Sequence, residues 1–88
     1  MRLRIHWTPT SVLHIERHGI SPKDVHAVIT GWYVVTRTGT RRRLIGSTAD
    51  RILTVIVEPS RLEAGSYEVV TARPSSRREK RLFRKERR

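Results

Sequence analysis

The chain has 88 residues without cysteine, and its 19 lysines and arginines against 8 aspartates and glutamates give a net charge of +11. This length allows one small domain, over residues 1–88, and the missing thiols exclude disulfides and thiolate metal sites. No run approaches the roughly 18 apolar residues of a membrane span, and no apolar leader is present, so we expect a soluble cytoplasmic protein with no membrane partner. Sixteen of the cations are arginine, which indicates a nucleic acid or an acidic protein as partner.

The first residues predict a strand and then a helix. Apolar residues alternate with polar ones over 2–7, as in a half-buried strand. Thr8 followed by Pro9 is typical of a helix start, and Gly19 is suited to the left-handed conformation that ends a helix.

A second helix is predicted directly afterwards. Ser21 has the hydroxyl of an N-cap residue and Pro22 suits the first helical position. Ile20 and Val25 have the spacing of a hydrophobic staple across the helix start. Gly31 closes the segment.

Four strands are predicted next, because β-branched and aromatic residues alternate with turn signals. Their expected ranges are Trp32–Thr36, Arg41–Ser47, Arg51–Glu58 and Ser66–Arg73. The third range is apolar on both faces, which indicates a central strand. On the last one, a period of two places Tyr67 on the same face as Arg73.

The final segment, 75–88, predicts a basic helix whose last residues fray. Ser76 and Glu79 have the spacing of a capping box, and Leu82 and Phe83 are its only apolar residues, so we expect shallow burial. The element order predicts a two-layer α+β fold, with an N-terminal strand and two helices packed on a three- or four-stranded antiparallel sheet.

An ordered set of short segments resembles the BrnT toxin family, which belongs to the RelE/ParE-like toxins of bacterial type II toxin–antitoxin systems. The segments are Trp7, Arg17–Ser21, Gly46–Thr48, Arg51–Val55, Val70–Arg73 and Arg77–Glu79. The resemblance implies a RelE-like fold and an endoribonuclease that cleaves RNA without a metal and inhibits translation. It also implies that a ribbon-helix-helix antitoxin neutralises the toxin. We expect the partners to be mRNA, which the ribosome could hold, and an acidic or ribbon-helix-helix antitoxin, which could bind in an oligomer.

Metal-independent RNA cleavage uses the 2′-OH of the substrate as nucleophile, and therefore needs a base, an acid and cations beside the phosphate. We expect Arg73 and Arg51 to supply the cations. His18 is the candidate acid or base, since its unperturbed pKa lies near neutrality. Tyr67 could orient the substrate or donate a proton.

Each candidate also has a structural interpretation. Arg73 could simply pair with Glu68 or Glu79, and Arg51 could form an ion pair at the sheet edge. His18 precedes a glycine at a helix end and could cap the last carbonyls. A tyrosine in a strand often only packs.

Six further arginines are candidate RNA-binding residues, because guanidinium groups bind phosphates. They are Arg41, Arg42, Arg43, Arg77, Arg78 and Arg81. His14 and His18 are one helical turn apart but have no third ligand at a suitable spacing, so we predict no metal and no cofactor. A non-catalytic RNA- or ribosome-binding module is the alternative function, and a structural partner for an acidic protein is a third.

Overall fold

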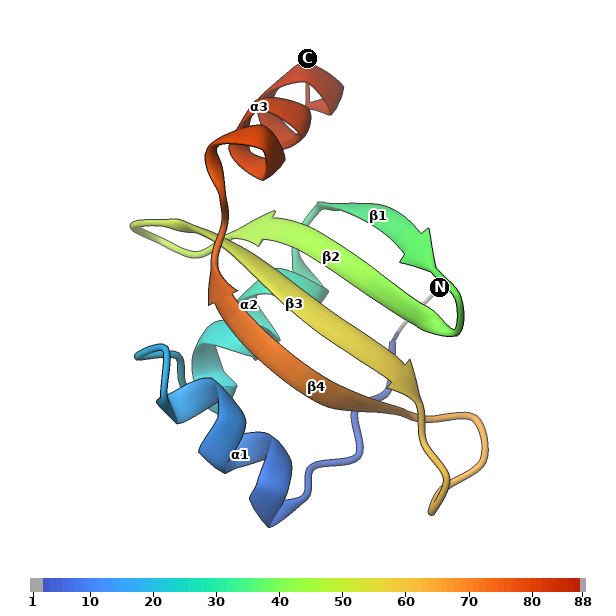
Figure 1. Cartoon of the computed structure of the whole chain (residues 1–88). Coiled ribbons are helices and arrows are strands. Elements are labelled where there is room, and N and C mark those ends of the chain that lie inside the picture. Colours follow the sequence, from blue (N-terminus) through green and yellow to red (C-terminus); the bar gives the residue numbers. More distant parts are fainter. Residues whose placement is uncertain (1–2, 88) are drawn as a thin grey trace.

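The computed structural model describes residues 3–87, which form an antiparallel sheet of four strands and three helices (Figure 1). The elements are α1 (Pro9–Glu16), α2 (Pro22–Thr30), β1 (Tyr33–Thr38), β2 (Arg41–Ser47), β3 (Ile52–Pro59), β4 (Tyr67–Pro74) and α3 (Arg77–Glu86). The strands lie in the order β1-β2-β3-β4, which confirms the predicted α+β class. None of the helices within 3–87 is long and apolar enough to cross a membrane.

The predicted helix starts are confirmed. The Thr8 side chain accepts a hydrogen bond from a backbone N–H of the first turn of α1, and Ser21 forms a reciprocal capping box with Asp24. Gly19 has a φ of 69°, a left-handed conformation that favours glycine. These local signals fix where the chain enters α1 and α2.

The predicted strand over 2–7 was wrong in its extent. Arg2 lies outside the described residues, and the rest of the segment makes one parallel bridge, between Ile5 and Tyr67, flanked by two backbone hydrogen bonds of 2.8 Å. The pairing stops there because Thr8, the N-cap of α1, follows within three residues. The segment therefore covers only the start of β4.

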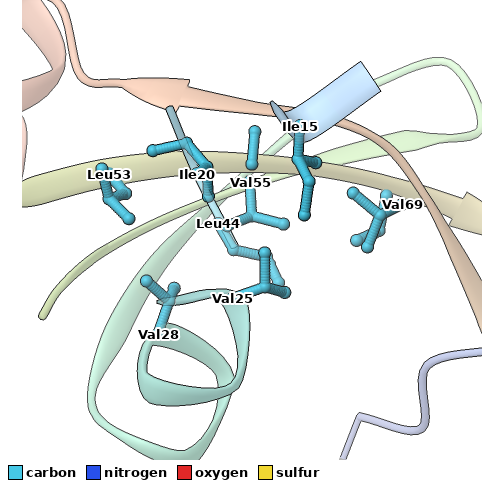
Figure 2. Packing of buried hydrophobic residues seen from close by; sticks show 10 residues of the cluster. Ile15, Ile20, Val25, Val28, Leu44, Leu53, Val55 and Val69 are labelled. Atoms are coloured by element: carbon cyan, nitrogen blue, oxygen red, sulfur yellow. The ribbon is translucent and has the colours of Figure 1, made fainter. Parts of the chain in front are cut away.

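The hydrophobic core lies between the sheet and the layer of α1 and α2 (Figure 2). It consists of Ile15, Ile20, Val25, Val28, Leu44, Leu53, Val55, Val57, Val69 and Ala72, all at most 3% exposed. Gly46 lets α2 approach β2 closely, since a Cβ at that position would lie 2.9 Å from a Val28 methyl group. We call this side of the sheet the helix face.

The opposite side of the sheet, which we call the open face, carries α3 at one end. Phe83 is only 3% exposed, and its ring lies 5.4 Å from the ring of Trp32, just before β1. Beneath α3, Ile45 of β2 is fully buried. The predicted shallow burial therefore holds for α3 except at Glu79 and Phe83. The helix gains its anchorage from two buried side chains, Glu79 and Phe83, rather than from a long apolar stripe.

A bulge interrupts β4 and corrects the predicted side-chain alternation. Val69 pairs with Val57 and Thr71 pairs with the preceding residue of β3, so Val70 is the extra residue. The bulge reverses the phase of β4, and Tyr67 therefore faces the helix layer while Arg73 faces the open side. The two residues do not share a face as predicted.

Candidate functional site

A buried carboxylate on the open face joins two arginines from different strands. Glu79, in the first turn of α3, accepts hydrogen bonds of 2.6 and 2.9 Å from the two terminal nitrogens of Arg73 on β4. Arg43 on β2 donates a third, of 3.1 Å, from its Nη1. The Glu79 side chain is 5% exposed, whereas those of Arg73 and Arg43 are 32% and 42% exposed. Both arginine side chains are thus partly exposed.

The same carboxylate caps the helix, because it accepts the Ser76 backbone N–H at 2.8 Å. The bonds from Arg73, followed by that backbone bond, lower the pKa of Glu79 from 4.5 to about 2, and they raise the pKa of Arg73. Glu79 is therefore ionised at neutral pH and is unsuited to proton transfer. Its role in this arrangement is to hold two guanidinium groups.

Hydrogen bonds hold both guanidinium groups of the cluster in place. Arg43 also donates from Nε to the Thr36 hydroxyl, at 3.0 Å, so its guanidinium is held from two directions. Fixed cations beside a reacting phosphate stabilise the charge that develops in a transition state without reorganising. We call Arg43, Arg73 and Glu79 the Glu79 cluster.

Arg51 and His18 lie elsewhere. Arg51 donates to the Gly19 carbonyl at 2.9 Å and to the Asp24 carboxylate at 3.4 Å, which places its guanidinium on the helix face. The Ser21 backbone N–H, aided by Arg51, lowers the pKa of Asp24. His18 is exposed beside this contact, and within 3–87 its ring makes no hydrogen bond.

Arg51, His18 and Arg73, which were predicted to form one site, are therefore divided between the two faces of the sheet. Arg51 and His18 lie beside the turn between α1 and α2, whereas Arg73 lies beneath α3. The structural interpretation of Arg73, an ion pair with Glu79, is realised.

Tyr67 lies at the far end of β4, opposite Pro59. It is six residues from Arg73, a distance of about 20 Å along a strand. The Arg42 guanidinium lies over its ring, 5.1 Å from the centroid. Tyr67 therefore belongs to a different surface from the Glu79 cluster.

The predicted alternation of the three consecutive arginines is confirmed. Arg41 and Arg43 point to the open face, where Arg41 pairs with Glu58 at 3.3 Å, and Arg42 points to the helix face. On α3, four arginines are exposed, namely Arg84 and the three predicted RNA-binding residues Arg77, Arg78 and Arg81. Their contact with RNA remains a prediction.

Two histidine contacts were not predicted. His14 on α1 donates from Nδ1 to the carbonyl of Val70, at 3.0 Å, and so satisfies the bulged residue of β4. His6 contacts Glu63 at 3.1 Å. Each joins residues more than fifty positions apart, and no local pattern indicates such pairs. Within 3–87, no three histidine or acidic side chains are grouped to hold a metal.

The chain thus has an α+β fold in which a four-stranded antiparallel sheet carries two helices on one face and a basic C-terminal helix on the other. It is similar to the crystal structure of the Brucella abortus ribonuclease toxin BrnT, with a TM-score of 0.62 and 24% sequence identity. The match covers 85% of this chain and 99% of the toxin. At this identity the likeness shows the fold. No family model and no curated protein matches the chain.

Proposed function

We propose that the chain is the toxin of a type II toxin–antitoxin pair, a RelE-like endoribonuclease that cleaves RNA without a metal and inhibits translation. The observation that supports this most directly is the Glu79 cluster, in which a buried carboxylate fixes two part-exposed guanidinium groups on the open face. The fold similarity to a protein described as a ribonuclease toxin supports the same reading.

In this proposal, Arg73 and Arg43 bind the scissile phosphate while the 2′-OH of the preceding ribose attacks it. The attack forms a 2′,3′-cyclic phosphate and breaks the bond to the 5′-oxygen of the next nucleotide, while water accepts the 2′-OH proton and protonates the leaving oxygen. The charge of the two arginines stabilises the phosphorane, and this electrostatic contribution is usually the largest in such reactions. Glu79 acts as a positioning residue, because its pKa of about 2 prevents it from serving as base at neutral pH. Arg51, His18 and Tyr67, on the helix face, would contact flanking parts of the RNA.

A second function, a non-catalytic RNA- or ribosome-binding module, is favoured by one observation. The guanidinium groups of Arg43, Arg51 and Arg73 are all paired with carboxylates, and within 3–87 no histidine contacts the Glu79 cluster. In that case the exposed arginines of α3 would bind RNA directly. The same arginines would bind an acidic antitoxin under the first proposal, alone or in an oligomer.

Induced expression in bacteria tests the proposal. We expect the wild type to arrest growth and to fragment cellular RNA, and Arg73→Gln to do neither at equal soluble yield. Arg61→Gln, at an exposed arginine of the β3–β4 loop, serves as the charge-matched control and should remain toxic. Normal growth with abundant soluble wild type would contradict a toxin. Equal loss from both variants would favour the binding module.

A further inference from the structure

A groove of about 770 Å³ opens on the helix face, at the end of the sheet formed by the β1–β2 turn and the β3–β4 loop. Its principal lining residues are Arg4, Tyr33, Val35, Arg37, Arg42 and Tyr67. We call it the Tyr67 groove. Its size is within the 300–1,000 Å³ typical of ligand sites. It lies at the opposite end of β4 from Arg73, and on the other side of the sheet.

The cations of this groove are not neutralised by the protein. Among the described residues, neither Arg37 nor Arg42 has a carboxylate within ion-pair distance, and Arg4 reaches Glu63 only at 4.0 Å with a side chain that is 75% exposed. The arginines of the Glu79 cluster, by contrast, share one carboxylate. The groove therefore has more positive charge without a carboxylate partner than the Glu79 cluster has, and this charge favours an anionic ligand.

The groove also presents aromatic surface. The Arg42 guanidinium lies over the Tyr67 ring at 5.1 Å, and Tyr33 contributes a second part-exposed ring from β1. Val35 adds apolar surface, with 44% of the residue exposed. Tyrosine rings and guanidinium planes are the groups on which proteins stack unpaired nucleobases.

We infer that the Tyr67 groove binds a single-stranded RNA segment, with a base stacked on the Arg42 guanidinium that lies over Tyr67 and an adjacent phosphate on Arg37. The inference rests on the proposed function in taking RNA as the ligand, and it does not depend on cleavage. Because the groove lies about 20 Å from Arg73, it holds a flanking segment rather than the scissile phosphate. An acidic peptide would engage the arginines and leave the rings unused.

The test is fluorescence anisotropy with a labelled, unstructured 12-nucleotide RNA at near-physiological salt. We expect Tyr67→Leu to weaken binding about tenfold through lost stacking. Tyr67→Phe keeps the ring and should bind as the wild type does. Arg42→Gln should weaken binding because it removes the stacking plane, and Arg37→Gln should make the salt dependence shallower by about one phosphate contact. Arg61→Gln, an exposed arginine outside the groove, is the matched control.

Circular dichroism spectra identical to the wild-type spectrum establish that the variants remain folded. Wild-type affinity for RNA in both Tyr67→Leu and Arg42→Gln would overturn the inference. A poly-glutamate peptide is measured in the same way, and variants that lose affinity for this peptide but not for RNA would also overturn it. The failure of the proposed function is a separate result. If the protein binds RNA through the groove but does not cleave it, the groove inference stands and the proposed nuclease activity is contradicted.

Discussion

Glu79 and Arg73 form a bidentate ion pair in which each carboxylate oxygen accepts from one terminal nitrogen of the guanidinium, at 2.6 and 2.9 Å. The same carboxylate caps α3 through the Ser76 backbone. One side chain therefore both starts the C-terminal helix and fixes the arginine at the end of β4. Any change to Glu79 should affect the stability of the fold and the geometry of the candidate site together.

Replacing Glu79 with alanine should lower the free energy of unfolding by about 3 kcal/mol, because it leaves two guanidinium groups unpaired and removes a helix cap. Chemical denaturation measures the change. Glu86→Ala, at the exposed end of α3, is the control and should change stability by less than about 0.5 kcal/mol. Equal stability of the two variants would contradict the role given to Glu79.

Stability should also depend on pH through Glu79. Its pKa is about 2 in the folded protein and 4.5 ordinarily, so the ionised form favours folding. The contribution, about 3 kcal/mol, is complete above pH 4.5 and is lost as the pH falls from 4.5 toward 2. Urea denaturation across this range should show a decline in the wild type that is smaller in Glu79→Gln. Parallel curves would show that Glu79 is not the responsible group.

Gly46→Ala should destabilise the protein by about 1–3 kcal/mol, because the added methyl group would lie 2.9 Å from a Val28 methyl group and force α2 from β2. Thermal unfolding measures this effect. Ser47→Ala, one position further along β2, should change stability little. A neutral Gly46→Ala would mean that α2 and β2 are packed less closely than described.

His14→Ala should lower stability by about 1 kcal/mol, since it removes the donor to the bulged Val70 carbonyl. Amide hydrogen exchange should accelerate near the bulge. Leu13, its neighbour on α1, is 59% exposed, and Leu13→Ala should have a smaller effect on both measurements. If amide exchange near the bulge is unchanged in His14→Ala, the hydrogen bond from His14 does not stabilise the bulge.

The sequence allowed most of the fold to be predicted, because its signals are local. Thr8, Ser21 and Ser76 each place a hydroxyl at a helix start, and the structure uses all three as N-caps. The continuous apolar run beginning at Ile52 identified a strand that is paired on both sides. These features depend on neighbouring residues alone.

The candidate site was harder to predict, because it depends on strand phase and register. Nothing around Val70 marks a bulge, since the residue resembles its neighbours and its carbonyl is satisfied by His14, 56 positions away. Without the bulge, Tyr67 and Arg73 would share a face. The pairing of Arg43 with Glu79 likewise depends on α3 crossing to the open face, which no helix signal specifies.

The most direct test of the proposed nuclease is cleavage of a mixed RNA by purified protein in EDTA, at near-physiological salt. The wild type should cleave, Arg73→Gln should not at matched fold and RNA affinity, and Arg61→Gln should cleave like the wild type. Products with 2′,3′-cyclic phosphate ends are expected from attack by the 2′-OH. An intact RNA in every reaction, also with translating ribosomes added, would contradict the account.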